Sequence, residues 1–495
     1  MLNSIPDALS VLLSVQGIAV LVLGTMLGIV MGALPGIGST VAVAMILPFT
    51  LTMEQAPAIL LLIAIYAGSV YGGSVSAILI NTPGTPQSAA TCLDGYPMAQ
   101  RGEAGIALGW STVASVCGGL ASALLLIFAA PQLAAFALNF GPIETFTLVL
   151  LGLTCIVSVS EGSLVKGLLA GMLGLFLSTV GGDPITGEAR FTFGYFPLIS
   201  GFNLLAVVIG VFALSEVLTR VSRKLDTTKA LVEFNGIVLP KLSQWKGRLG
   251  NLAKSVAIGC GIGVLPGTGA ATAAFISYAE ARRSSRNATS FGKGEPDGLV
   301  ASEAANNAVT GGALIPTMAL GIPGDAVTAV MLATLTLHGV SPGVRLMTDN
   351  PILIAAIFVG FLLINILLLP LGMLVSKVAA PLLRMRESFM LAAISILCVV
   401  GVYFVRGNPF DLLIMVCAGI VGFLLRGRGF PMPPLVIGMV LGPTLEISLR
   451  QGLIITDGSF AAFFTGHPIA LFLLIAALGM LGLPLIRYLR SRRHS

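Results

Sequence analysis

A short proline–glycine motif occurs twice in this chain, and each copy interrupts a long apolar stretch. The copies are LPGIG at residues 34–38 and LPGTG at residues 265–269. Proline lacks an amide proton and glycine tolerates positive φ, so each motif predicts a break in a helix. Inside a bilayer such a break must be buried in protein or line a wet cavity. The duplication therefore predicts a site built from broken helices, as in secondary transporters.

Composition places the chain in a membrane. Of its 495 residues 56% are hydrophobic and 10% are charged, whereas soluble domains carry about 25% charged residues. Continuous apolar runs of about 20 residues, enough to cross a bilayer as helices, recur from Val11 to Arg490. We expect an all-α polytopic membrane protein with about 10–12 transmembrane helices, some of them broken or re-entrant.

The distribution of basic residues predicts the topology. No lysine or arginine precedes Arg101, whereas basic residues cluster at 220–254 and in the last nine positions. The positive-inside rule places both clusters in the cytoplasm and the N-terminus on the periplasmic side. The net charge of +6 is therefore a topology signal, and we expect no nucleic-acid partner. The six cysteines form no CxxC pair, so neither a metal site nor a disulfide framework is predicted.

Other motifs also recur, in the same order. Gly72-Gly73 with the break at 81–84 matches Gly311-Gly312 with the break at 321–324. We predict a first membrane repeat at 1–219, a basic cytoplasmic linker at 220–254, a second repeat at 255–460, and an extra helix with a basic cytoplasmic tail at 461–495. A first half that starts outside and ends inside crosses an odd number of times, so the second repeat should be inverted.

Basic residues flank the second LPGxG motif on both sides. The intervening segment, 255–281, is too short for two crossings, which predicts a re-entrant hairpin with its tip near Pro266 and Gly267. Whether the first copy is re-entrant stays open, because residues 11–31 are long enough to span.

The ends of broken helices suit a carboxylate, because helix N-termini present unpaired amides and a partial positive charge. The alternative is that these glycines and prolines serve only as kinks and packing points. A polar stripe on one helical face at 302–310, which includes Glu303, extends the predicted substrate path, although interhelical hydrogen bonding explains it equally well. The predicted substrate-binding residues are Pro35, Gly36, Gly38, Ser39, Thr40, Pro266, Gly267, Thr268, Gly269, Asn306, Asn307 and Thr310.

The partner breaks carry oxygen-rich groups that suit a dehydrated cation. Asp325 is the most informative residue, because an ionisable group between apolar runs is a functional candidate. Its alternative role is that of a helix N-cap. The predicted cation-binding residues are Asn81, Thr82, Gly84, Thr85, Pro323, Gly324 and Asp325. Charged residues at the ends of apolar runs are interpreted as interface anchors, namely Lys166, Arg190, Arg345 and Arg406.

With these motifs the chain resembles the large permease subunit of tripartite tricarboxylate transporters, the TctA family. The resemblance covers the two LPGxG breaks, the segment 302–310 and GIPGD at 321–325. It implies an inner-membrane permease that works with a small four-helix membrane subunit and a periplasmic solute-binding protein. It further implies import of citrate-like carboxylates coupled to Na⁺ or H⁺. The substrate, the coupling ion and the oligomeric state, a homo-oligomer included, stay open.

Two other functions compete with this one. An aspartyl protease in the membrane would need two facing acids, and Asp183 with Asp325 is the nearest pair, although neither lies in a GxGD motif. A passive anion channel is the second alternative. We expect a carrier with no enzymatic activity, no cofactor, and no metal beyond transported Na⁺.

Overall fold

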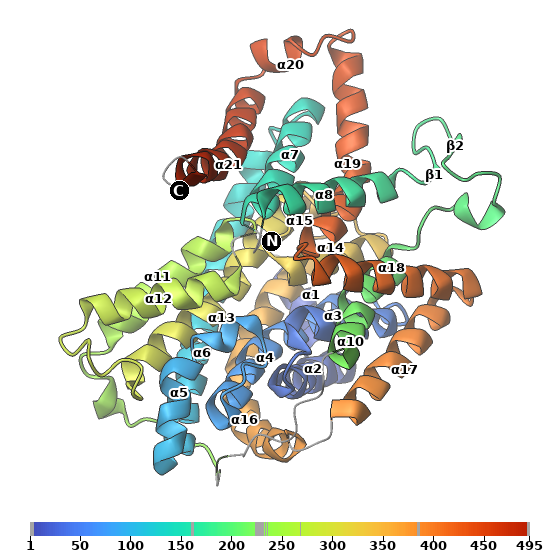
Figure 1. The fold of residues 1–495 in the computed structure, drawn as a ribbon. Coiled ribbons are helices and arrows are strands. Elements are labelled where there is room, and N and C mark those ends of the chain that lie inside the picture. Colours follow the sequence, from blue (N-terminus) through green and yellow to red (C-terminus); the bar gives the residue numbers. More distant parts are fainter. Residues whose placement is uncertain are drawn as a thin grey trace.

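The computed structural model describes residues 4–159, 163–222, 232, 234, 236–267, 269–383 and 387–492. Within these residues the fold is almost entirely helical (Figure 1). The described strands are β1 (Gly181–Gly182) and β2 (Ala189–Arg190), which pair antiparallel with Gly181 opposite Arg190. The prediction of an all-α polytopic membrane protein is confirmed.

The helices of the first half follow one another through short connections. They are α1 (Ile5–Leu12), α2 (Val15–Ala33), α3 (Gly38–Thr50), α4 (Gln55–Ile80), η2 (Pro86–Ala89), α5 (Cys92–Met98), η3 (Ala99–Glu103), α6 (Ala104–Ala137), α7 (Pro142–Val159), α8 (Leu164–Ser178), η4 (Phe196–Leu198), α9 (Leu204–Ile209), η5 (Gly210–Leu214) and α10 (Ser215–Ser222).

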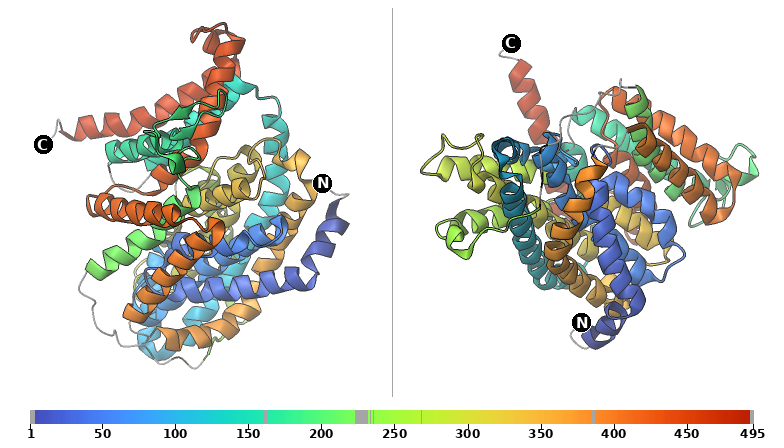
Figure 2. Two further views of the ribbon diagram at one scale, coloured as in Figure 1. Left: turned by 90° about the vertical axis from the view of Figure 1, so that its right-hand side faces the viewer. Right: turned by 90° about the horizontal axis from the view of Figure 1, so that it is seen from below.

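The second half repeats this order with small differences. Its helices are η6 (Leu242–Trp245), α11 (Leu249–Val264), α12 (Ala270–Ser284), α13 (Pro296–Leu320), α14 (Ala326–Leu337), α15 (Leu346–Asp349), α16 (Pro351–Leu382), α17 (Glu387–Arg406), α18 (Pro409–Gly427), α19 (Pro433–Ile455), α20 (Ala462–Thr465) and α21 (Pro468–Arg492). Helices α1 and α21 lie on opposite sides of the molecule (Figure 2).

Six helical segments in the described part of the chain are long and apolar enough to cross a membrane, and seven further apolar helices are shorter. The expected 10–12 transmembrane helices included broken ones, and the shorter helices α3, α11 and α14 adjoin the proline–glycine breaks. The predicted hairpin is present as α11 and α12, which pack against each other and turn at Pro266 and Gly267.

The duplicated motif adopts a duplicated backbone conformation. Helices α2 and α11 end at leucines with φ/ψ of −74°/115° and −82°/113°. The next glycines are left-handed, with φ of 85° at Gly36 and 83° at Gly267. The partner breaks also correspond, because α4 and α13 both end at a left-handed residue, Asn81 and Gly321. Asparagine tolerates this region better than other side chains, so Asn81 acts here as a helix C-cap.

Packing between the halves is reciprocal. Helix α6 of the first half packs along α13 of the second, while α16 of the second packs along α4 of the first. Likewise α8 packs on α19, whereas α18 packs on α9, η5 and α10. Each half thus completes the core of the other.

Helices α2 and α4 approach closely through small residues. A Cβ placed on Gly28 would lie 2.6 Å from the carbonyl oxygen of Ile65, and one on Gly72 would lie 2.2 Å from that of Ile29. Glycine at such contacts lets membrane helices pack backbone to backbone. This pair supports the first LPGxG break, which follows α2 directly.

A buried carboxylate ties the halves together. Asp94 of α5 is 1% exposed, and its Oδ2 accepts a hydrogen bond from the Tyr278 hydroxyl at 2.8 Å. Its Oδ1 accepts three backbone amides from the loop between α12 and α13, at 2.9, 2.8 and 2.8 Å. The sequence Leu93-Asp94-Gly95 recurs in the second half as Leu337-His338-Gly339. There the Gln55 side chain donates a hydrogen bond to the backbone carbonyl of His338 at 3.0 Å.

Candidate functional site: a cavity lined by the helix breaks

Both LPGxG motifs and both partner breaks meet at one cavity of about 730 Å³. This volume lies within the range of small-molecule pockets, roughly 300–1,000 Å³. The predicted residues that line it are Pro35, Gly36, Gly38, Ser39, Thr40, Thr82, Gly84, Thr85, Gly267, Gly269 and Asp325. Residues almost 300 positions apart are thus brought together by the repeat.

The N-terminus of α3 contributes unpaired polar groups to this cavity. The first amides of a helix have no intrahelical acceptor, and the cap residue Ile37 offers no side-chain bond. Ser39 is 2% exposed and its hydroxyl has no hydrogen-bond partner among the described residues. Such a helix end favours an anion.

Asp325 lies across the cavity from this wall, at the start of α14. Its Oδ1 accepts the Thr328 amide at 2.8 Å, which makes it the N-cap of α14. Its Oδ2 accepts a hydrogen bond from the hydroxyl of Tyr66, a fully buried residue of α4. Asp325 therefore both caps a helix and faces the cavity. Thr85 holds the equivalent position at the start of η2, with its own capping box.

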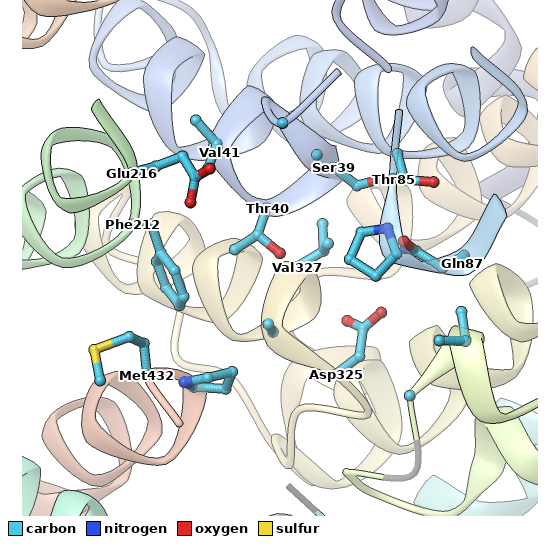
Figure 3. Close-up of a pocket in the computed structure, with 18 of the residues that line it drawn as sticks. Ser39, Thr40, Val41, Thr85, Gln87, Phe212, Glu216, Asp325, Val327 and Met432 are labelled. Atoms are coloured by element: carbon cyan, nitrogen blue, oxygen red, sulfur yellow. The ribbon is translucent and has the colours of Figure 1, made fainter. Parts of the chain in front are cut away.

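Charged side chains that the sequence analysis did not select also line the cavity. Arg220 and Glu216 come from α10, and Arg426 comes from α18. Glu216 accepts Arg220 Nε at 2.9 Å and forms a second ion pair with Arg426. Figure 3 shows Glu216 and Asp325 on opposite sides of the cavity, with Thr40 drawn between them. Helix α10 runs through Arg220, so it crosses the boundary predicted at 219; residues 223–231 of the predicted linker lie outside the described residues.

The whole set of breaks matches a known family. The model of the tripartite tricarboxylate transporter TctA family matches residues 18–437. The chain belongs to this family. The membership confirms the resemblance drawn from the motifs. The family is one of transporters, and with the apolar helices it makes the chain a multi-pass membrane component of a tricarboxylate transport system.

Two proteins from Agrobacterium vitis are similar to this TctA-family chain. A protein described as "Uncharacterized 52.8 kDa protein in TAR-I ttuC' 3'region" is 39% identical over 475 residues, covering 95% of this chain and 93% of the relative. An "Uncharacterized protein in TAR-II ttuC' 3'region" is 39% identical over 237 residues, covering 47% of this chain and 96% of the relative. No solved structure matches the chain.

Several predicted site residues of this TctA-family chain do not line the cavity. They are Asn81, Pro266, Pro323 and Gly324 around the breaks, and Asn306, Asn307 and Thr310 on α13. Gly324 is nevertheless adjacent, because its carbonyl accepts the Gly267 amide at 2.7 Å and so joins the two breaks of the second half. Thr268 lies outside the described residues.

The polar stripe on α13 is buried between helices. Glu303 is fully buried and accepts hydrogen bonds from Ser74 at 2.6 Å, Ser115 at 2.9 Å, and Thr91. Asn307 donates to the Glu303 carbonyl at 3.1 Å. The Glu303 bonds join α13 to neighbouring helices, as in the interhelical alternative, whereas the Asn307 bond lies within α13 and the buried Asn306 amide has no partner among the described residues. The stripe does not line this cavity, and its role in a substrate path stays a prediction.

Asp183 lies in the β1–β2 loop and does not line the cavity. Arg450 Nη2 approaches its Oδ2 at 2.9 Å, and Arg190 Nη1 lies 3.3 Å from the same atom. Backbone amides, chiefly that of Thr186, and the Arg450 guanidinium lower the pKa of this carboxyl below its usual range. Asp183 and Asp325 are therefore not brought together as a protease dyad. Within the described residues, no three His, Cys, Asp or Glu side chains converge as metal ligands.

Proposed function

We propose that this chain is the permease subunit of a secondary active transporter that imports citrate-like tricarboxylates or related small carboxylates across the bacterial inner membrane. The observation that carries the proposal is the convergence of both helix-break pairs, one from each half, on one cavity. The N-terminus of α3 and the guanidinium groups of Arg220 and Arg426 supply attraction for carboxylates.

The same proposal includes coupling to a cation, Na⁺ or H⁺. Asp325, Thr82 and Thr85 line the same cavity and carry side-chain oxygen atoms, and hard cations bind such ligands. A carrier in which cation and carboxylate bind in one cavity can neutralise each charge with the other. Because a carboxylate and its cation are both costly to desolvate alone, joint binding favours joint transport.

The family implies further subunits. In our proposal these are a small four-helix membrane protein and a periplasmic solute-binding protein that delivers the carboxylate. The N-terminus lies on the periplasmic side and the basic C-terminal tail in the cytoplasm, as the positive-inside rule requires. No cofactor takes part.

Uptake by reconstituted vesicles tests this function. Proteoliposomes that hold the full chain and the small subunit receive the solute-binding protein loaded with labelled citrate, and Na⁺ and proton gradients are imposed separately. We expect citrate to accumulate above its external concentration under one gradient and to leak out when an ionophore collapses that gradient. Equilibration without accumulation under both gradients would overturn the carrier and favour the passive channel.

A further inference from the structure

Three charged side chains form a compact cluster on one wall of the cavity. The side chains of Arg220, Glu216 and Arg426 are 22%, 21% and 29% exposed, so each keeps part of its surface open. Glu216 lies between the guanidinium groups, with one carboxylate oxygen on each. The formal charge of the cluster is therefore positive, and its bridging group is a carboxylate, the same chemical group as the proposed substrate.

Arg220 also contacts the first helix break. A Cβ placed on Gly36 would lie 1.1 Å from Arg220 Nη2 and 1.5 Å from its Cζ, so the guanidinium packs directly on this turn. The α3 N-terminus follows two residues later, with the Ser39 hydroxyl that has no partner in the described part of the chain. Two anion-attracting places thus lie next to each other, one at the α3 N-terminus beside Arg220 and one between Arg220 and Arg426.

We infer that Glu216 occupies the place that one carboxylate of a bound substrate takes between Arg220 and Arg426, and that this internal carboxylate selects di- and tricarboxylates over monocarboxylates. The inference rests on the proposed function, because it assumes that the cavity binds carboxylates. It makes Glu216, Arg220 and Arg426 specificity-determining residues.

The physical reason is a competition between tethered groups. Glu216 is covalently held beside the arginines, so its effective concentration there is at least millimolar. A free monocarboxylate must displace it with a single charge. A polycarboxylate that has bound the α3 N-terminus with one group presents its second group intramolecularly too, so it competes with Glu216 on similar terms.

Substitutions in the cluster test this selection by direct binding to the full chain in lipid nanodiscs. Calorimetric affinities are measured for citrate, glutarate and butyrate, which carry three, two and one carboxylates. In Glu216→Gln, butyrate should bind about tenfold tighter and the ratio of citrate to butyrate affinity should shrink. In Arg426→Gln, citrate should bind about tenfold more weakly while butyrate changes less than about twofold.

Arg428→Gln is the matched control, because Arg428 is an exposed arginine two positions along that does not line the cavity. Arg428→Gln should leave the affinities for all three carboxylates as in wild type. If Glu216→Gln does not fold, Glu216→Asp, which withdraws the carboxylate by one methylene, should shrink the same ratio. An unchanged ratio in a folded Glu216 variant would overturn the inference alone. Failure of wild type to bind any of the three carboxylates would instead overturn the proposed function.

Discussion

Two substitutions of Asp325, to asparagine and to alanine, can distinguish its role in stabilising the fold from its proposed role in transport. Its Oδ1 caps α14 through the Thr328 amide, and its Oδ2 accepts the Tyr66 hydroxyl. Asparagine keeps an oxygen for the cap and is as good an N-cap as aspartate. The free energy of unfolding of Asp325→Asn should therefore lie within about 0.5 kcal/mol of the wild-type value. Asp325→Ala removes the cap of α14 and takes away the acceptor of the buried Tyr66 hydroxyl. Together these losses should lower the free energy of unfolding by about 2–4 kcal/mol.

Transport should rank these variants differently. If the carboxylate holds the coupling cation, Asp325→Asn should lower gradient-driven citrate uptake at least about tenfold, equivalent to about 1.4 kcal/mol. Tyr66→Phe keeps the charge and removes only the donor, so it should retain most of the uptake. Thermal unfolding in detergent and uptake per folded transporter are measured on the same preparations.

One result would refute this reasoning. If Asp325→Asn takes up citrate as fast as wild type under the driving gradient, while Asp325→Ala loses uptake in proportion to folded protein, then Asp325 is only a helix cap. The cation site would then have to be sought among the other oxygens of the cavity.

Three further predictions follow from the described contacts. Gly36→Ala should lower the free energy of unfolding by about 1–2 kcal/mol, because the position has a φ of 85°. The added Cβ should also push Arg220 off the turn, so citrate uptake per folded protein should fall. Unchanged uptake would contradict this placement of Arg220. Gly28→Ala should lower the melting temperature in detergent, because the added Cβ would lie 2.6 Å from a carbonyl oxygen. The control Gly261→Ala places its Cβ where no described atom lies within 4 Å, so it should be neutral or stabilise the protein by about 0.5–1 kcal/mol. Equal melting temperatures of the two variants would refute the close packing of α2 on α4. The pKa of Asp183 is lowered in the folded state. The ionised Asp183 carboxylate therefore stabilises the fold fully above about pH 4, and this stabilisation is lost as the pH falls through the lowered folded pKa. Asp183→Asn should weaken the fall of the melting temperature at acid pH, and an unchanged fall would contradict the ion-pair assignment.

The helix breaks could be predicted because their cause is local. Proline and glycine determine the backbone of the LPGxG motifs, and the same left-handed turns recur at Gly36 and Gly267. Residues of both motifs also line one cavity, as expected if the two halves arose by duplication. Asn81 is a predicted cation ligand as part of the oxygen-rich break, whereas the structure uses its tolerance of positive φ to end α4.

The arginines of the cavity could not be selected in this way. Arg220 begins a basic cluster and therefore looks like a cytoplasmic anchor, and Arg426 lies near the end of an apolar run. Only the packing of α18 on α10 brings them to the same carboxylate. The i, i+4 spacing of Glu216 and Arg220 was the available signal. The stripe on α13 does not line the cavity, and the reason is a different one: this helix is buried on all sides from Gly298 to Ala319. The 3.6-residue periodicity of the stripe shows which side chains share a face of the helix but not which helices pack against that face.

The carboxylate of Asp94 has a consequence for how the two halves could have diverged. Duplicated halves start with the same residue at both equivalent positions, and the same connection at both ends. Among the described residues, four hydrogen bonds to Asp94 hold one end, while one side-chain bond to the carbonyl of His338 is formed at the other. The two equivalent contacts between the halves are therefore unequal in their hydrogen bonding. If the halves rock against each other during transport, we expect the contact at His338 to open before the contact at Asp94.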